Sequence, residues 1–546
     1  MDWGVAPGRW GEPRTSSHTV GDALDPRTLA FAHAHLGPAG SAPAPKEPRV
    51  DPSRLSDDRV GELFAGIQAR TDDDARARLS RGMSYVNLLS WRSDEPVRVP
   101  DAVLFPRSHE QVLAILSVCS TERIAVVPVG GGTSVTGGID TPESDAVVAV
   151  SMDRMRSVLD FDEESALVTV EAGITGPELE SFLNPRGWTL GHFPQSFERA
   201  SIGGYIAARS SGQSSSGYGR IEDLLIGAHV ATPVGTWDVG GYPAQSSGPD
   251  LRHLVLGSEG ALGIVTSAQL RVRARPTLRE YTASILPGDF AAAASAVRAL
   301  TRSPLRPTVM RASDPAETEA LLTMSAPRGV TGWAFATYVR LRRARPGSLI
   351  ILGFESTSES TVGAMRAFAR ETLGERGAVS IGNGPGRAWE RGRFRGPYQR
   401  DALIDAGYLV ETFETIVPWS QLKATHERLS NAARNALGSR AYVMAHISHS
   451  YDVGASLYFT VLAGGRSDPS ESAQQWRRAK ATIMDALVDS GAAISHHHGV
   501  GRDHLTWFGL SIDGVSTDVL RRVKASVDPR GIMNPGALVP GQGGGP

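Results

Sequence analysis

The alternation of apolar and polar positions divides the chain into blocks with different periodicities. In residues 96–276, short apolar runs typical of buried strands, such as Ile124-Ala-Val-Val, Val147-Val-Ala-Val and Leu167-Val-Thr-Val, alternate with helical patterns. Helices are predicted at 109–120 and at 175–183, and a hairpin strand is predicted near residues 224–235. This block predicts a mixed α+β domain.

Residues 277–500 have a longer rhythm, in which apolar strands alternate with helices. Strands are predicted at 282–286, 349–354 and 456–462, and helices at 289–302, 360–375, 420–436 and 471–489. This rhythm predicts a second domain whose sheet carries helices on one face.

Two further segments flank these domains. Residues 1–95 begin with a Pro- and Gly-rich stretch and continue into a predicted helix at 57–92, whose first turn is acidic. Residues 501–546 form a C-terminal segment. The fold class predicted is therefore α+β, with domains at 96–276 and 277–500 and helical or extended segments at both ends.

Composition narrows the class of protein. The 546 residues are 41% hydrophobic and 21% charged, and the net charge of −2 argues against a nucleic-acid-binding protein. The one cysteine, Cys119, rules out an internal disulfide, and its apolar helical surroundings predict a buried, inert thiol. Since neither an 18-residue apolar run nor a signal-peptide pattern is visible, we expect a cytoplasmic protein.

A glycine-rich loop follows the strand at 124–128. Gly130, Gly131 and Gly132 leave backbone N–H groups open to an anion, and Thr133 and Ser134 add hydroxyl donors. The loop is neither a Walker loop nor a GxGxxG fingerprint. Taken alone it is equally compatible with a flexible turn. Two more small-residue loops, at 201–212 and 257–266, favour ligand binding over a flexible turn. Together the three loops indicate a long phosphorylated ligand lying across the backbone.

Together these loops resemble the FAD-binding domain of the vanillyl-alcohol oxidase and para-cresol methylhydroxylase superfamily. Glu171-Ala-Gly and the terminal Asp528-Pro-Arg-Gly-Ile-Met-Asn also match its pattern. The resemblance implies a two-subdomain FAD-binding domain, a substrate-binding cap domain, and a C-terminal segment that returns to the FAD domain. The implied FAD-contacting residues are Pro128, Val129, Gly130, Gly131, Gly132, Thr133, Ser134, Gln195, Ser196, Ser201, Gly203, Gly204, Ala208, Arg209, Ser210, Ser211, Glu259, Gly260, Ala261, Leu262, Gly263, Ile264 and Val265. The resemblance also bears on how FAD is attached, because many members of that superfamily tether the flavin through a His or Cys near the first glycine loop. The first loop of this sequence contains neither residue, so we expect non-covalent FAD.

The second block carries the candidate reactive groups. His496, His497 and His498 stand in a row, and Tyr458 lies in an apolar strand. The histidines could be a metal-binding tract or plain surface, although consecutive strand residues point to alternate faces and rarely share one ion. The alternative is that they line a pocket and exchange protons, and Tyr458 is either a core aromatic or a proton donor.

The segments that contain Tyr458 and the three histidines resemble the alkyl-dihydroxyacetonephosphate synthase family. The likeness includes Trp10-Gly, Arg81-Gly-Met-Ser, Tyr218-Gly-Arg-Ile-Glu-Asp-Leu, Ser247-Gly-Pro-Asp and Glu411-Thr-Phe-Glu-Thr. It implies that Tyr458 is the acid/base, that His496, His497 and His498 form the essential triplet, that Arg400 binds substrate and that Arg311 lies near the flavin. One departure is Pro194-Gln-Ser, where the family has Pro-Asp-Ser.

The resemblance implies a redox-neutral exchange, in which a fatty alcohol replaces the acyl group of acyl-dihydroxyacetonephosphate through a flavin N5 adduct. The expected partners are the lipid phosphate, the fatty alcohol, a second copy in a homodimer and a membrane surface contacted peripherally; no metal is expected. The alternatives are an FAD-dependent dehydrogenase or oxidase of a 2-hydroxy acid such as lactate or glycolate, and a flavin-binding scaffold without activity. Retention of the reactive residues argues against the last.

Overall fold

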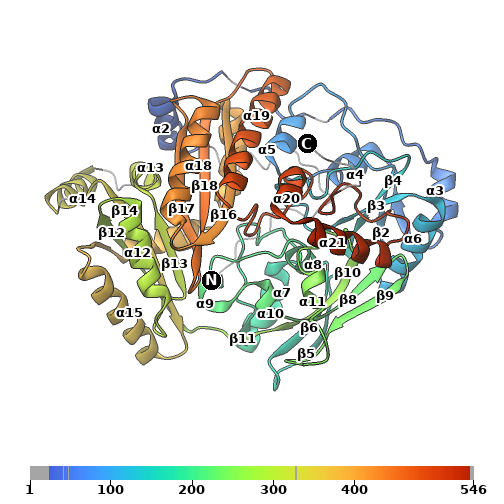
Figure 1. Cartoon of the computed structure of the whole chain (residues 1–546), viewed down its shortest axis with the longest axis horizontal. Helices are drawn as coiled ribbons and strands as arrows, with labels where there is room; N and C mark the ends of the chain where they lie inside the picture. Colours follow the sequence, from blue (N-terminus) through green and yellow to red (C-terminus); the bar gives the residue numbers. More distant parts are fainter. Residues whose placement is uncertain (1–23, 41, 47, 326–328, 343, 541–546) are drawn as a thin grey trace.

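The computed structural model describes residues 24–40, 42–46, 48–325, 329–342 and 344–540, so the Trp10-Gly motif lies outside the described residues. Three large β-sheets organise this part of the chain. Figure 1 shows the two smaller sheets on one side of the molecule and the largest sheet on the other. The mixed α+β class predicted from the sequence is confirmed.

The first sheet has four strands in the order β1-β2-β4-β3, with β2, β4 and β3 parallel. Its strands are β1 (Gln68–Arg70), β2 (Ala102–Phe105), β4 (Val147–Ser151) and β3 (Ala125–Val129). Helix α6 (His109–Glu122) begins at the Ser108 cap and packs its apolar face, including Cys119, on this sheet. Cys119 has no exposed surface, as predicted.

The second sheet is antiparallel, and its strand order is β5-β6-β10-β8-β9. Its strands are β5 (Val158–Asp162), β6 (Leu167–Glu171), β10 (Ile264–Arg271), β8 (Leu225–Thr232) and β9 (Gly235–Gly240). The predicted hairpin is the β8–β9 pair, which closes at Thr232 and Gly235. Helices α7 (Gly176–Leu183) and α8 (Ile202–Ala207) bury their apolar sides in the same core.

The third sheet is antiparallel and has the strand order β15-β12-β14-β13-β17-β18-β16. Its strands are β15 (Val379–Gly382), β12 (Leu278–Pro287), β14 (Gly347–Ser356), β13 (Val309–Ser313), β17 (Tyr442–Ser450), β18 (Gly454–Gly464) and β16 (Tyr408–Pro418). The four predicted helices occur as α12 (Phe290–Thr301), α15 (Glu359–Gly374), α18 (Leu422–Leu437) and α19 (Pro469–Asp489). They share the main hydrophobic core with one face of this sheet, where Phe413, Leu457 and Phe459 are buried.

The opposite face is only partly open, so the prediction of helices on one face was incomplete. Helices α2 (Pro26–Leu36), α13 (Pro315–Ser325) and α17 (Gly396–Asp405) supply Phe31, Ala320 and Leu403 to a core with β16, β17 and β18. Helix α2 is far from these strands in sequence, and its apolar spacing gives no indication of the surface that it covers. The polar middle of the face lines the cavity described below.

The single helix predicted at 57–92 was wrong. The segment forms α3 (Asp57–Leu63), the edge strand β1, α4 (Asp73–Arg78) and α5 (Tyr85–Ser90). Ser56, Asp72 and Ser84 each accept a backbone N–H at the start of one helix, so a separate capped helix begins at each of these three residues. Gly82 lies against the Ser134 carbonyl so closely that a Cβ atom would be 2.2 Å from its oxygen.

The C-terminal segment, with α20 (Leu505–Ser511) and α21 (Gly514–Val527), runs back along the first two sheets. Met533 forms a parallel bridge with Val126 of β3. The Asn534 side-chain amide donates to the carbonyls of Gly138 at 2.8 Å and Glu259 at 2.7 Å, and so links two glycine loops. Among the described residues, no helix is both long and apolar enough to cross a membrane.

Candidate functional site

A cavity of about 1220 Å³ separates the glycine loops from the open face of the seven-stranded sheet. It is larger than the common range of roughly 300–1,000 Å³ for ligand pockets, and so has room for a cofactor and a second molecule. The structure brings most of the predicted cofactor residues to its wall. Those that do not line it are Val129, Arg209, Ala261 and Leu262. Gln195, at the position of the departure from the family pattern, lines the same cavity.

The glycines of the first loop are required by contact between loops. A Cβ atom on Gly130 would be 2.3 Å from the Ser201 hydroxyl, and one on Gly131 would be 2.1 Å from the Arg199 carbonyl oxygen. The Ser201 hydroxyl also accepts the backbone N–H of Gly204 and caps α8. The close approach places the backbone of the first two loops on one wall of the cavity, which is a suitable cradle for a dinucleotide.

Strand register aligns three polar side chains on the open sheet face. Tyr458 of β18 lies directly opposite Glu414 of β16 and His446 of β17. Opposed residues in adjacent antiparallel strands point to the same side of a sheet, so the three form one row. The Tyr458 ring stacks on His446 with a centroid distance of 5.0 Å and on His497 at 5.9 Å.

The three histidines lie in a loop that we call the histidine loop, Ser495–Gly501. The buried carboxylate of Glu414 accepts the backbone N–H of His496 at 2.6 Å, of His497 at 3.1 Å and of His498 at 2.9 Å. It also accepts the Ser495 hydroxyl at 2.6 Å. Burial opposes its charge, but the neighbouring imidazoles and the Ser495 hydroxyl lower the pKa of Glu414 well below its ordinary value.

A second carboxylate holds the other end of this loop. Glu259, in the third glycine loop, accepts the backbone N–H groups of Val500 and Gly501, both at 2.6 Å. Burial raises the pKa of Glu259 to about 7, although these two N–H groups act in the opposite direction. The histidine loop is therefore fixed between the third sheet and a loop predicted to contact FAD.

The three histidines differ in their placement. His497 and His498 line the cavity, whereas His496 does not. The His496 ring is 2.6 Å from the Tyr451 hydroxyl and 3.0 Å from the His497 Nδ1. Burial lowers the pKa of His497 to about 3 and that of His498 to about 4, so both imidazoles are neutral near pH 7 and are weaker bases than a free histidine.

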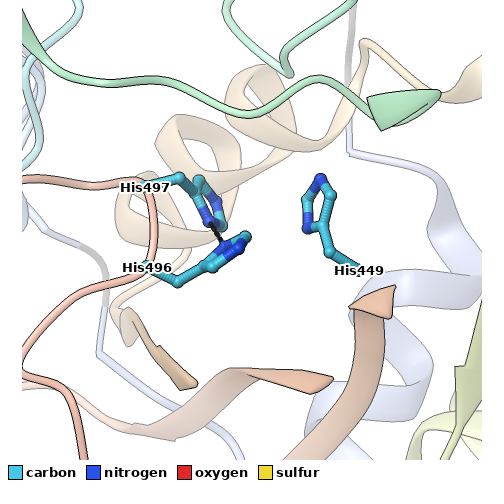
Figure 2. A group of neighbouring side chains, drawn as sticks. All are labelled: His449, His496 and His497. Carbon is cyan, nitrogen blue, oxygen red and sulfur yellow. Dashed lines mark hydrogen bonds between the residues drawn. The ribbon is translucent and has the colours of Figure 1, made fainter. Parts of the chain in front are cut away.

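His449, His496 and His497 also come close enough together for a shared metal ion to be considered. Their nitrogens lie within 4.8 Å of one another, and Figure 2 shows the rings with the bond between His496 and His497. Each of the three rings already has at least one hydrogen-bonded nitrogen, however. The His449 Nε2 is 2.9 Å from the Gly212 carbonyl oxygen, and the His496 Nε2 is bonded to Tyr451. The arrangement is accounted for by these hydrogen bonds and carries no metal assignment.

The two predicted arginines both line the cavity, but their charges are balanced differently. Arg311 forms an ion pair with Glu317 at 2.9 Å and lies 2.9 Å from the His446 Nε2. Burial would raise the pKa of Glu317, but Arg311 and His446 lower it to about 2. Arg400 donates to the Met83 carbonyl, and among the described residues its buried Nε has no hydrogen-bond partner. Arg400 is therefore the better placed of the two to bind an anionic group.

Away from the polar row, the sheet face becomes apolar. The next row contains Thr412, Thr460 and Met444, and the row after it contains Val410 and Leu462. At this end the cavity is also lined by residues of α2, α13 and α17 and of the segment before α3. The small or apolar residues among them are Thr28, Phe31, Ala42, Ala44, Pro45, Pro48, Ala320, Leu321, Met324 and Leu403, and the charged residues Lys46, Asp401 and Asp405 of the same segments also line the cavity.

Sequence reasoning missed several residues of this site, namely Glu414, Glu317, His446 and His449. A usable signal exists for two of them. Glu414 is one of two carboxylates, with Glu411, inside a strand whose ends are apolar, which indicates buried partners. His446 and Ser448 alternate along β17, which indicates a polar face. The pairing of Arg311 with Glu317 depends on the turn from β13 into α13 and has no such signal.

Comparison with known proteins places this architecture in a class. A family model described as an FAD binding domain matches residues 100–240, and one described as the C-terminal domain of FAD linked oxidases matches residues 279–538. A solved structure of p-cresol methylhydroxylase shares the fold, with a TM-score of 0.66 at 16% identity over 89% of this chain and 98% of that one. The fold and the glycine-loop cavity are those of an FAD-binding enzyme of the FAD-linked oxidase type.

Two closer similarities narrow the class. The chain is 32% identical to an alkyldihydroxyacetonephosphate synthase of Dictyostelium discoideum over 505 residues, which cover 90% of this chain and 82% of the relative. A solved structure of an alkyldihydroxyacetonephosphate synthase superposes with a TM-score of 0.79 at 30% identity and covers 93% of this chain and 92% of that one. The chain belongs to the alkyldihydroxyacetonephosphate synthase family.

Proposed function

We propose that the protein is an FAD-dependent transferase that replaces the acyl group of acyl-dihydroxyacetonephosphate with a fatty alcohol. The exchange releases a fatty acid, and the alcohol loses its proton as the new ether bond forms, so no net oxidation occurs. One observation carries the proposal. A single cavity joins the glycine loops, the polar row of Tyr458 and a long apolar wall made by β16, β17, β18, α2 and α13.

The polar and apolar ends of this cavity suit the two parts of such a substrate. A phosphate needs a cation that is not already neutralised, and Arg400 fits this requirement better than Arg311. An acyl or alkyl chain needs an apolar channel, which the row of Val410 and Leu462 and its covering helices supply. A small hydroxy acid such as lactate would leave this apolar part of the cavity without a function.

The reactive side chains are placed for proton transfer. Removal of a proton beside the ketone needs a base, and the imidazoles of His497 and His498, which line the cavity, are the candidates for it, although burial lowers their pKa and makes them weaker bases than a free histidine. Burial raises the pKa of Tyr458, so its phenol stays protonated and can donate to the leaving carboxylate. The stacking of Tyr458 between His446 and His497 keeps the proposed proton donor next to a proposed proton acceptor.

The residues present fit FAD, and we propose that it is held without a covalent bond. The loops at 128–134, 201–211 and 259–265 would hold it, with Gly130 and Gly131 giving its pyrophosphate access to backbone N–H groups. Cys119 lies in the α6 core and does not line the cavity. When bound, FAD would supply the electron sink at N5 of its ring that this exchange needs without net oxidation.

The decisive experiment incubates the purified flavoprotein anaerobically with acyl-dihydroxyacetonephosphate and an isotope-labelled fatty alcohol. We expect labelled ether product and free fatty acid, with the flavin absorbance restored when substrate is exhausted. Because the chain matches a model of FAD linked oxidases, lactate and glycolate are tested in parallel. Lasting flavin bleaching by a hydroxy acid, without ether formation, would overturn the proposal. Release of FAD by acid precipitation tests the non-covalent attachment.

A further inference from the structure

Two hydrogen bonds link a histidine of the cavity wall to the turn between β17 and β18. The His497 Nδ1 lies 3.0 Å from the His496 Nδ1, and Figure 2 shows the bond between the two rings. The His496 Nε2 lies 2.6 Å from the Tyr451 hydroxyl oxygen. Both nitrogens of His496 are therefore engaged. We call Tyr451, His496 and His497 the histidine–tyrosine chain.

The two ends of the histidine–tyrosine chain differ in their surroundings. His497 lines the cavity, and its Nε2 has no hydrogen-bond partner among the described residues. His496 is 6% exposed and does not line the cavity. Tyr451 is partly exposed and begins a turn whose next residues, Asp452 and Val453, are exposed. The bonds therefore run from the cavity through a buried ring to the protein surface.

The position of Glu414 indicates which nitrogens carry protons. Burial opposes its charge, but the neighbouring imidazoles hold the pKa of Glu414 well below its ordinary value, and its carboxylate lies 3.7 Å from the His497 Nδ1. A negative charge on this side favours a proton on Nδ1, so His497 keeps its Nε2 as an acceptor. His496 then accepts at Nδ1 and donates from Nε2 to the Tyr451 oxygen, which leaves the Tyr451 hydroxyl to donate outward.

The environment of the two rings makes a positive charge on either of them costly. Burial lowers the pKa of His497 to about 3 and holds the pKa of His496 well below its ordinary value. Arg220 adds a permanent positive charge, because its guanidinium donates to the His496 carbonyl at 2.9 Å. A ring that gains a proton at one nitrogen and loses one from the other stays neutral, so transfer along the chain avoids this cost.

The proposed exchange requires a proton to leave the substrate and a proton to return. The carbon that carries the acyl group is a CH₂ group in the substrate ester, and it is again a CH₂ group in the product ether. A proton removed from this carbon must therefore be replaced before the product leaves. A single buried imidazole would have to hold that proton as a cation, whereas a chain that ends at the surface would not.

We propose that the histidine–tyrosine chain is a proton relay between the cavity and water. As the His497 Nε2 takes the substrate proton, the proton on its Nδ1 passes to His496. The proton on the His496 Nε2 passes to the Tyr451 oxygen, and the Tyr451 hydroxyl proton passes to water. The reverse shift returns one proton to the carbon, so each turnover restores the starting state.

The members of the relay have different roles. Tyr451 and His496 are positioning residues, because they act through His497, which alone of the three lines the cavity. The use of the relay in turnover rests on the proposed function, whereas the positions of the protons in the resting protein do not.

Turnover in D₂O tests the relay, because a proton passed to water is replaced by deuterium. We expect deuterium at the CH₂ group of the ether product of the wild type, detected by mass spectrometry. Tyr451→Phe removes the hydroxyl that ends the chain, so its kcat should fall roughly tenfold, with unchanged FAD content. Its product should contain mostly protium, because His497 returns the proton that it took. Added imidazole, a small diffusible base, should restore part of the rate.

His496→Gln provides a second variant, because an amide keeps a hydrogen-bonding side chain but does not relay protons. It should behave like Tyr451→Phe, and combining the two should add little, since both interrupt one path. Tyr408→Phe is the matched control, because its hydroxyl donates to the Gly37 carbonyl at 2.9 Å, outside the relay. This control should keep the wild-type kcat and deuterium content. A Tyr451→Phe enzyme whose product contains as much deuterium as that of the wild type would overturn the relay, even if its kcat is lower.

A measurement without turnover separates the relay from the proposed function. In the resting holoenzyme with ¹⁵N-labelled histidine, NMR should show His497 protonated on Nδ1 and not on Nε2. The signals of His497 are identified by their loss in His497→Gln. Protonation of His497 on Nε2 would overturn the relay. Absence of ether product in the wild type, with His497 protonated on Nδ1, would count against the proposed function alone.

Discussion

Glu414 on β16 lies directly opposite Tyr458 on β18, in the same row of the open sheet face. The Glu414 carboxylate accepts three consecutive backbone N–H groups of the histidine loop. Because the strand register fixes Glu414 next to Tyr458, the same carboxylate also fixes the distance between Tyr458 and the imidazoles. Glu414 is therefore a positioning residue for the proposed proton transfer and does not itself line the cavity.

Replacing Glu414 with Gln should disturb both stability and turnover. An amide keeps one acceptor oxygen and turns an NH₂ group toward backbone donors, which leaves buried N–H groups unpaired. We expect a loss of about 2–3 kcal/mol in the free energy of unfolding. Displacement of the histidine loop should lower kcat by roughly 100-fold. Denaturant unfolding and steady-state kinetics measure the two effects.

Glu411→Gln is the matched control for this experiment. Glu411 lies on the same strand, but it accepts from Lys480 at 3.0 Å and from Trp476 at 2.6 Å, away from the histidine loop. Its replacement should cost stability while kcat stays close to the wild-type value. Equal losses of kcat in the two variants would contradict the positioning role of Glu414.

The Glu414 anchor also illustrates which parts of the site could be predicted from sequence. The glycine loops, Tyr458 and the histidines are local patterns with unusual residue types, so they stand out without a fold. Glu414 gains its role from strand register and from a loop some eighty residues later, and Glu317 gains its role from Arg311 across a turn. Pairings of this kind depend on tertiary packing, and no spacing of residues in a single sequence indicates which side chains will meet.

The same distinction holds for the fold. The three strands and four helices predicted in 277–500 follow a strong apolar period, and the structure contains them within a few residues of the predicted bounds, but the strands β13, β15, β16 and β17 were not predicted. The segment 57–92 has weaker apolar periodicity, and the caps at Asp72 and Ser84 divide it into short helices. The cover that α2 provides for the open sheet face depends on a contact between segments hundreds of residues apart.

Tyr458→Phe should separate chemistry from binding. The phenol is proposed to donate a proton, whereas the ring stacks on His446 and His497 and is retained in Phe. We expect unchanged FAD content and a loss of roughly 100- to 10,000-fold in kcat. Tyr451→Phe is the comparison, because it removes a bond to His496 without removing a cavity-lining group. Its kcat should fall much less, and a Tyr458→Phe enzyme with full activity would exclude Tyr458 from the mechanism.

Arg400→Gln and Arg311→Gln should have different consequences. Among the described residues, no carboxylate is a hydrogen-bond partner of Arg400, so its loss should raise the KM for the phosphate substrate by roughly 10- to 100-fold. Arg311 neutralises buried Glu317, so its loss should lower the free energy of unfolding by about 3 kcal/mol. The test compares the KM of each variant for the phosphate substrate with its KM for a ketone ester that lacks the phosphate. If Arg400→Gln impairs both substrates equally, Arg400 does not bind the phosphate.

Glu259→Gln should change the pH dependence of stability. Burial raises the pKa of Glu259 to about 7 from an ordinary value of 4.5. A carboxyl group with a raised folded-state pKa contributes stability that is fully present below its unfolded pKa and is lost as pH rises through about 7. Between about pH 6 and pH 8.5 the free energy of unfolding of the wild type should fall by about 1 kcal/mol relative to that of Glu259→Gln. Unfolding curves that stay parallel over this range would contradict the assignment.

Thr460→Trp tests whether the apolar wall holds the substrate chain. Thr460 lies in the row between Tyr458 and Leu462 and lines the cavity, so an indole there would narrow the path from the polar row to the apolar end. We expect kcat/KM for long-chain alcohols to fall at least about tenfold, since overpacking costs about 1–3 kcal/mol. Short-chain alcohols should be used as before. Thr460→Val, which keeps the volume, is the control. Equal losses for short and long chains would mean that the chain does not run along β18.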